Sequence, residues 1–169
     1  MKKALVVVLV LSCLLLLVGC DPAQGYLDKD ELIANTVRID LVEYKNESPR
    51  ILDLRWGKQK PSFDLNNATF IATLDETYFE AFLDEITAYA YHNYASALNE
   101  PMGKTVILYQ ENGNMIVLFG CPYTNERGET WYYGDCYIFD ENGVFAEYIG
   151  RVGYLFGDQI ASEYFGYNP

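Results

Sequence analysis

Histidine is almost absent from this chain of 169 residues, which contains a single histidine, His92, and four cysteines. A serine or cysteine nucleophile needs a base, most often histidine, to activate it. A zinc centre needs about four cysteine, histidine or carboxylate ligands. His92 lies among tyrosines in a predicted strand, and no cysteine has an evident histidine partner. The sequence therefore argues against nucleophilic catalysis and against a metal centre.

Other catalytic motifs are missing as well. The chain has no G-x-S-x-G nucleophile elbow and no glycine-rich phosphate loop of standard spacing. Residues 140–143, D-E-N-G, begin like a calcium loop, but an EF-hand needs its glycine at position six and here the glycine is fourth. The acidic residues of 75–85 are interpreted as the solvated face of a helix. We therefore predict a protein that is not an enzyme and that has no metal or cofactor.

Basic residues are half as numerous as acidic ones, 12 against 24. Affinity for nucleic acid comes largely from lysine and arginine neutralising phosphates, so we expect no nucleic-acid partner. A basic protein or cationic peptide is the electrostatically favoured partner. Solubility alone is the alternative reason for the acidic surface.

The longest apolar run is 4–18, interrupted only by Ser12 and preceded by Lys2 and Lys3. A charged start and an apolar stretch of this length are typical of a secretory signal. As a helix the run spans about 22 Å, less than the ~30 Å hydrocarbon core of a bilayer. A signal peptide is therefore favoured over a permanent membrane span.

The run ends in Leu17-Val18-Gly19-Cys20, which resembles the lipobox of bacterial lipoproteins. The resemblance implies that residues 1–19 are removed and that Cys20 carries diacylglycerol and further acyl chains such as palmitate. Two or three chains anchor a protein stably, because each buried CH₂ contributes about 0.8 kcal/mol. The expected location is the cell membrane, lipid-anchored and facing outside the cytoplasm. An ordinary cysteine after a secretory signal is the alternative.

Removal of residues 1–19 takes away two lysines and no acid, which leaves 150 residues with ten basic and twenty-four acidic side chains, a net charge of −14. This length is enough for one domain with a real core. We predict a short tether at 20–29 and a single domain at 30–169.

Cys121 and Cys136 remain for the fold, in a compartment where disulfides persist. They flank the polar stretch 124–130, and a hairpin over 114–123 and 131–139 places them opposite each other. Pairing requires Cα atoms within about 7 Å, so we predict a disulfide. Two buried thiols, or a register that separates them, are the alternatives.

Alternation of apolar and polar residues predicts a half-buried strand over 35–44, with Val37, Ile39 and Leu41 inward. Weaker strands are predicted over 51–56 and 70–72. Thr73 and Glu76 match a capping box, and the amphipathic helix behind it has an apolar face. That face comprises Tyr78, Phe79, Phe82, Leu83 and Ile86.

After 103 the pattern predicts two hairpins, each around an Asn-Gly pair, at 112–113 and 142–143. A two-residue turn at 112–113 pairs Leu108 with Val117. Residues 88–97 are compatible with helix or strand, and we choose a strand. Residues 157–165 form a short C-terminal helix. The expected fold is α+β, an antiparallel sheet of about five to seven strands packed with one amphipathic helix and a short C-terminal helix.

The segments V-R-I-D-L-V-E-Y, F-L-D-E-I, N-E-P-M-G, Y-Q-E-N-G and S-E-Y-F occur in this order along the chain. In this order the chain resembles small uncharacterised lipobox-bearing lipoproteins of Gram-positive bacteria. The resemblance supports the lipid anchor and the order of elements, and it implies no activity.

Five of the ten basic residues of the mature chain fall within 45–60, around Trp56. Tryptophan, tyrosine and arginine are enriched at binding hot spots. We predict a ligand-binding segment that comprises Arg55, Trp56, Lys58 and Lys60. The alternative is a hairpin whose lysines aid solubility while Trp56 packs inward.

The sequence thus predicts a membrane-anchored, non-enzymatic binding module for a protein, a peptide or a cell-wall glycan. The alternative function is an acidic inhibitor or protective lipoprotein that acts against a basic envelope-attacking enzyme. Salt distinguishes the two, because attraction between net charges weakens as ionic strength rises.

Overall fold

The computed structural model describes residues 24–45, 51–52, 60–92, 98–99, 103–124, 127–128, 130–152 and 157–166. Their elements in chain order are β1 (Gln24–Gly25), α2 (Lys29–Asn35), β2 (Thr36–Tyr44), β3 (Ile51–Leu52), η2 (Leu65–Asn67), β4 (Ala68–Thr73), η3 (Glu76–Tyr78), α3 (Phe79–Thr87), β5 (Tyr91–His92), β6 (Leu98–Asn99), β7 (Gly103–Gln110), β8 (Met115–Thr124), β9 (Thr130–Phe139), β10 (Phe145–Val152) and α4 (Gly157–Phe165).

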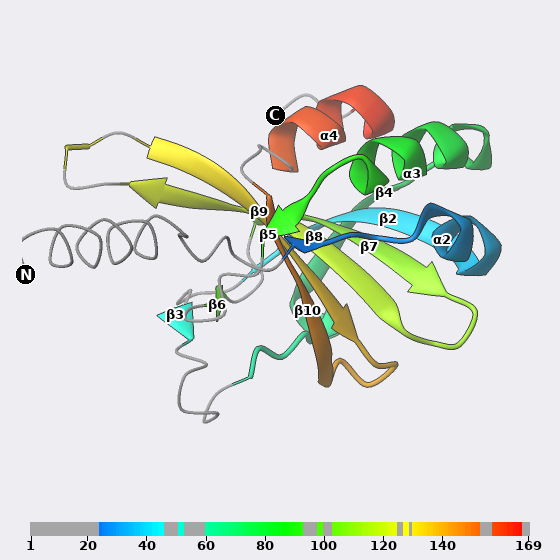
Figure 1. The fold of residues 1–169 in the computed structure, drawn as a ribbon, viewed down its shortest axis with the longest axis horizontal. Helices are drawn as coiled ribbons and strands as arrows, with labels where there is room; N and C mark the ends of the chain where they lie inside the picture. Colours follow the sequence, from blue (N-terminus) through cyan, green and yellow to red (C-terminus); the bar gives the residue numbers. More distant parts are fainter. Residues whose placement is uncertain are drawn as a thin grey trace, which may run out of the picture.

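The strands form one antiparallel sheet in the order β1-β5-β10-β9-β8-β7-β2-β4, beside a separate β3-β6 pair (Figure 1). This confirms the predicted α+β fold. The two-residue strands β1 and β5 bring the sheet to eight strands, one more than the upper limit expected. The C-terminal helix α4 lies where the sequence predicts it.

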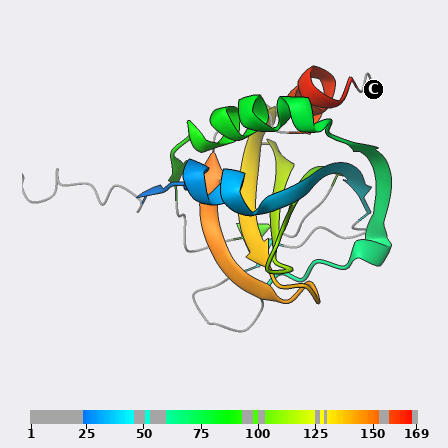
Figure 2. The same cartoon turned by 90° about the vertical axis from the view of Figure 1, so that its right-hand side faces the viewer.

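Within the described residues, helices α2, α3 and α4 lie on the same side of the sheet (Figure 2). Leu32 of α2, Phe82, Leu83 and Ile86 of α3, and Ile160 of α4 are buried in one cluster with the strand side chains beneath them. We call this cluster the helix-side core. The apolar face predicted for α3 is therefore its packing face, except that Tyr78 is 55% exposed.

The caps of these helices differ from the prediction. Asp75, not Thr73, caps the turn that precedes α3, because its carboxylate accepts a hydrogen bond from the Thr77 amide at 2.9 Å. The Thr73 hydroxyl instead donates to the buried Asp40 at 2.8 Å. Helix α2 was not predicted, and its first residue, Lys29, falls within the predicted tether. The helix begins after Asp28, whose carboxylate accepts a hydrogen bond from the Glu31 amide at 2.9 Å.

Strand β2 is buried on both faces rather than on one. Ile39 and Leu41 belong to the helix-side core, whereas Val42 and Tyr44 belong to a second cluster on the opposite face. Val37, predicted to point inward, is 54% exposed. The opposite face is covered in part by an extended segment at 60–64, from which Phe63 enters the second cluster.

Both Asn-Gly hairpins form, but with a register one residue away from the prediction. Leu108 pairs with Ile116, not with Val117. The Gln110 amide donates to the Asn114 carbonyl at 2.9 Å, so the loop contains three residues, 111–113. A two-residue type I′ turn needs positive φ at both central positions, and among the described residues only glycines have it, Gly113 at 87° for example.

Candidate functional site

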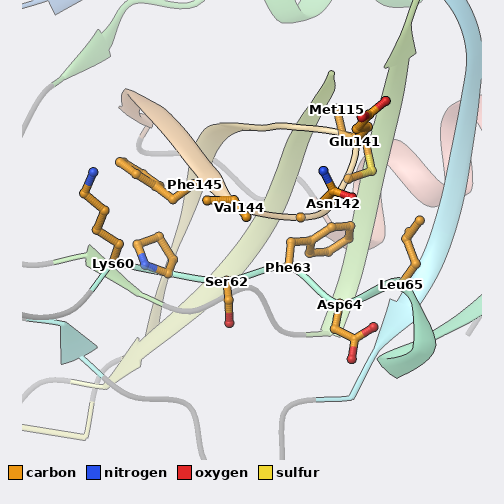
Figure 3. A pocket seen from close by; sticks show the side chains of 12 residues that line it. Lys60, Ser62, Phe63, Asp64, Leu65, Met115, Glu141, Asn142, Val144 and Phe145 are labelled. Carbon is orange, nitrogen blue, oxygen red and sulfur yellow. The ribbon is translucent and has the colours of Figure 1, made fainter. Parts of the chain in front are cut away.

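A cavity of about 610 Å³ lies on the side of the sheet away from the helices. It is lined by segment 60–65, by the β9–β10 turn at 141–144, by Phe145 at the start of β10 and by Met115 (Figure 3). This volume falls within the roughly 300–1,000 Å³ of small-molecule and peptide pockets. We call it the Lys60 cavity.

Segment 60–65 is held against the β9–β10 turn by backbone contacts. Ser62 forms an antiparallel bridge with Val144, and the Phe63 amide donates to the Gly143 carbonyl at 3.1 Å. Because an extended chain alternates its side chains, Phe63 projects to one side of the segment while Ser62 and Asp64 project to the other (Figure 3).

Phe63 anchors the segment to the second core. Its ring stacks on Tyr44, with centroids 4.8 Å apart, and on Phe139, with centroids 5.4 Å apart. The side chain is 2% exposed, and burying a phenylalanine contributes about 1.5–3 kcal/mol. The Tyr44 hydroxyl also accepts a hydrogen bond from the Asp64 amide at 3.0 Å. One wall of the cavity is therefore fixed by a side chain that lies in the core.

The polar side chains that line the cavity are those of Lys60, Ser62, Asp64, Glu141 and Asn142. The Lys60 ammonium lies 5.4 Å from the centre of the Phe145 ring. Asp64 is occupied locally, because its carboxylate accepts from both the amide and the side chain of Asn66 at 2.9 Å. Glu141 and Asn142 are exposed at the opposite rim. Apolar surface at the rim includes Val144, which is 60% exposed.

This arrangement is suited to binding. The lining residues include serine but no histidine or cysteine, so no activated nucleophile of the usual kind is present at the cavity. The cavity instead combines a partly apolar wall with one cation beside an aromatic ring. In concave binding sites, a few polar groups on an apolar wall orient the ligand.

Among the predicted ligand-binding residues, Lys60 is the one that the structure describes, and it lies at the cavity. Arg55, Trp56 and Lys58 lie outside the described residues, as do Cys20 and residues 1–19. The remaining walls, formed by Phe63 and the turn at 141–144, were not predicted. The turn chemistry of 142–143 was recognised, but nothing local in the sequence indicates that segment 60–65 crosses it.

The β8–β9 hairpin forms, but its register does not bring the two cysteines together. Cys121 pairs with Tyr133 and Cys136 pairs with Leu118. The cysteines are therefore three positions out of register, about 10 Å along a strand and beyond the ~7 Å limit for pairing. Cys136 is a free, buried thiol, so the predicted disulfide is not formed in this structure. Burial raises the pKa of Cys136 well above its ordinary value, which makes it an unreactive thiol.

A buried ion pair joins β9 and β10. The Asp135 carboxylate, with 0% of its side chain exposed, is bound by Nε and Nη2 of Arg151, each at 2.7 Å. The Tyr148 hydroxyl donates to the same carboxylate at 3.1 Å. Burial opposes the charge of Arg151, but the hydrogen bond to Asp135 and the negative charge of that carboxylate together raise the pKa of Arg151. Burial also raises the pKa of Tyr148. No pattern in the sequence predicts this cluster.

Comparison of the chain with known protein families, with curated proteins and with solved structures finds no match to any of them. Within the part of the chain that the structure describes, no helix is long and apolar enough to cross a membrane.

Proposed function

We propose that this chain is a non-enzymatic binding module, anchored outside the cytoplasm by acyl chains on Cys20, that holds a peptide or cell-wall glycan in the Lys60 cavity. The observation that carries the proposal is the position of Lys60. It is the last residue of the basic segment predicted to bind a ligand, and it lines a cavity of suitable size.

The geometry supports a ligand that presents an acidic or carbonyl group next to an apolar or sugar-ring face. Lys60 supplies three N–H donors, and the adjacent Phe145 ring supplies a flat apolar surface. Stacking on an aromatic ring and hydrogen bonds to a cation together fix the orientation of such a ligand. Because Phe63 is buried and holds its wall of the cavity against the core before a ligand binds, little of the binding free energy is spent in ordering that wall.

Loss of the Lys60 ammonium is expected to weaken binding at least about tenfold, equivalent to ~1.4 kcal/mol. The full chain, reconstituted in lipid nanodiscs, is presented to fractionated wall glycans and envelope proteins, and retained molecules are identified by mass spectrometry. Wild type and Lys60→Ala are compared at low salt and at about 1 M NaCl, where the screening length is ~3 Å.

Lys29→Ala is the matched control, because Lys29 lies on α2, on the other side of the sheet, and pairs with Asp84. Retention in high salt that is lost in Lys60→Ala and kept in Lys29→Ala supports the cavity as the site. Retention of basic proteins alone, equal in both variants and washed off by salt, refutes the proposal and favours the acidic inhibitor.

Replacing Cys20 with serine is expected to abolish lipid attachment, because a hydroxyl does not form the thioether that holds diacylglycerol. Cells expressing the full chain are fed labelled palmitate, and the label in the purified protein is measured. Cys13→Ser, within the apolar run, is the control and is expected to retain the label. Equal labelling of Cys20→Ser and wild type contradicts the lipid anchor.

A further inference from the structure

A second concave surface lies on the helix side of the sheet. It is a groove of about 650 Å³ between α2, the beginning of β2 and the η3–α3 region. Its floor is apolar, and it includes Ile33, which is 46% exposed, and Val37, which is 54% exposed. Phe79 and Leu83 of α3 continue the floor toward the core. Exposed apolar surface with a polar rim is typical of an interaction site.

Two carboxylates form the polar rim of this groove. Glu76 and Glu80 lie four residues apart along η3 and α3 and are both exposed. Among the residues that the structure describes, neither has an ion-pair partner. The hydroxyl of the remaining polar lining residue, Thr36, accepts a hydrogen bond from the side-chain amide of Gln110 at 3.0 Å.

The cations on the elements that form the groove have ion-pair partners of their own. Lys29 of α2 forms an ion pair with Asp84. Arg38 of β2 forms an ion pair with the buried Asp40 at 3.1 Å and lies 4.0 Å above the Tyr109 ring. The rim therefore presents negative charge beside an apolar floor, and this combination defines the ligand that fits.

We propose that the groove formed by Ile33, Val37, Phe79, Glu76 and Glu80 binds a cationic amphipathic peptide segment, whose apolar side chains cover the floor and whose lysine or arginine side chains contact Glu76 and Glu80. An anionic ligand is repelled by the rim. A second copy of the chain is disfavoured as the occupant. A symmetric contact brings the same two carboxylates of each copy together, and each copy has a formal net charge of −12, so the two copies repel each other.

This binding does not depend on the Lys60 cavity, which lies on the other side of the sheet, nor on the lipid anchor. It goes beyond the proposed function because it assigns a separate partner class to a separate surface. The overall negative charge favours a basic partner, and the groove is the specific surface at which such a partner would bind.

The probe is a synthetic amphipathic peptide of leucine and lysine, with a leucine–glutamate peptide of the same pattern for comparison. Binding to the full chain in phosphatidylcholine nanodiscs is measured by calorimetry, with empty nanodiscs subtracted. The double variant Glu76→Gln/Glu80→Gln is expected to weaken binding about tenfold or more (~1.4 kcal/mol). Ile33→Ala/Val37→Ala is expected to weaken it by a similar factor, without unfolding, because both side chains are already largely exposed.

Glu147→Gln/Glu163→Gln removes the same charge from two exposed positions that do not line the groove and is expected to leave the affinity unchanged. Equal weakening by both glutamate pairs shows attraction to net charge only and overturns the proposal. Unchanged affinity in Ile33→Ala/Val37→Ala, or equal binding of the leucine–glutamate peptide, also overturns it. The proposal is also overturned if sedimentation shows that the chain is a dimer and that Ile33→Ala/Val37→Ala dissociates this dimer.

Discussion

Replacing Asp135 with asparagine is expected to lower the free energy of unfolding by about 3–5 kcal/mol, the usual cost of breaking a buried ion pair by removing one partner. The Asp135 side chain is fully buried, and the partner that it leaves, Arg151, is only 17% exposed. The asparagine amide keeps one acceptor oxygen but presents an N–H₂ group in place of the other, so Arg151 keeps its charge and loses the carboxylate's negative charge and one of its two acceptors there.

Urea denaturation of the full chain measures this loss without the added salt that guanidinium brings. Arg151→Met in the asparagine background removes the stranded charge, and replacing both members of a buried pair is often neutral. We therefore expect the double variant to be more stable than Asp135→Asn alone. A loss below about 1 kcal/mol for Asp135→Asn, close to that of an exposed pair, contradicts this account.

The sequence alone predicted the long strands, α3 and the C-terminal helix in their order, but it did not predict α2 or the way in which the strands pair. Alternation, the apolar stripe of α3 and the two Asn-Gly pairs each report on a local preference of the chain, and these preferences survive in β2, α3 and both hairpins. Loop length depends instead on the backbone dihedral angles of the turn residues. At Asn112 a negative φ rather than a positive one changes the loop from two residues to three, and this change shifts the whole register.

The shift in register has a consequence for the core. Because side chains alternate between the faces of a sheet, a slip of one residue changes which residues share a face. The structure places Leu108 and Ile116 in the helix-side core, and Ile107 and Val117 in the second core. A strand that is apolar on both faces tolerates either register, so hydrophobicity alone does not decide between them.

The sites are predictable only where their residues are close in sequence. Lys60 belongs to a basic segment that composition reveals. Phe63 and Gly143, which meet at the cavity, are eighty residues apart in the chain. Asp135 and Arg151 pair across a hairpin whose strands contain register irregularities, and no local pattern indicates such a contact.

Replacing Gly143 with alanine is expected to destabilise the fold and open the Lys60 cavity. Gly143 has φ of 74°, and a Cβ built on it lies 1.8 Å from the Phe63 carbonyl oxygen. Left-handed backbone costs about 1–2 kcal/mol for a residue with a Cβ. The clash with backbone is additional, because segment 60–64 has to move and Phe63 has to leave part of its packing. Complete loss of a buried phenylalanine side chain costs about 3–5 kcal/mol.

The other hairpin provides the matched control. Gly113 occupies the same position of the same three-residue loop, with φ of 87°, and its added Cβ meets only the side chain of Glu141, at 3.2 Å. Gly113→Ala therefore retains the backbone strain, about 1–2 kcal/mol, with a flexible neighbour that can move aside. We expect Gly143→Ala to be less stable than Gly113→Ala by at least ~2 kcal/mol, roughly 4–8 °C in the melting temperature for a chain of this size.

The same pair of variants connects stability with function. Because the contact between Gly143 and Phe63 holds the wall that carries Lys60, Gly143→Ala is expected to weaken ligand retention as Lys60→Ala does, even below its melting temperature, whereas Gly113→Ala retains the ligand. Thermal unfolding and retention are measured on the same preparations. Equal melting temperatures for the two glycine variants contradict the close packing of segment 60–64 on the β9–β10 turn. A Gly143→Ala protein that is destabilised but binds normally places the ligand elsewhere than the Lys60 cavity.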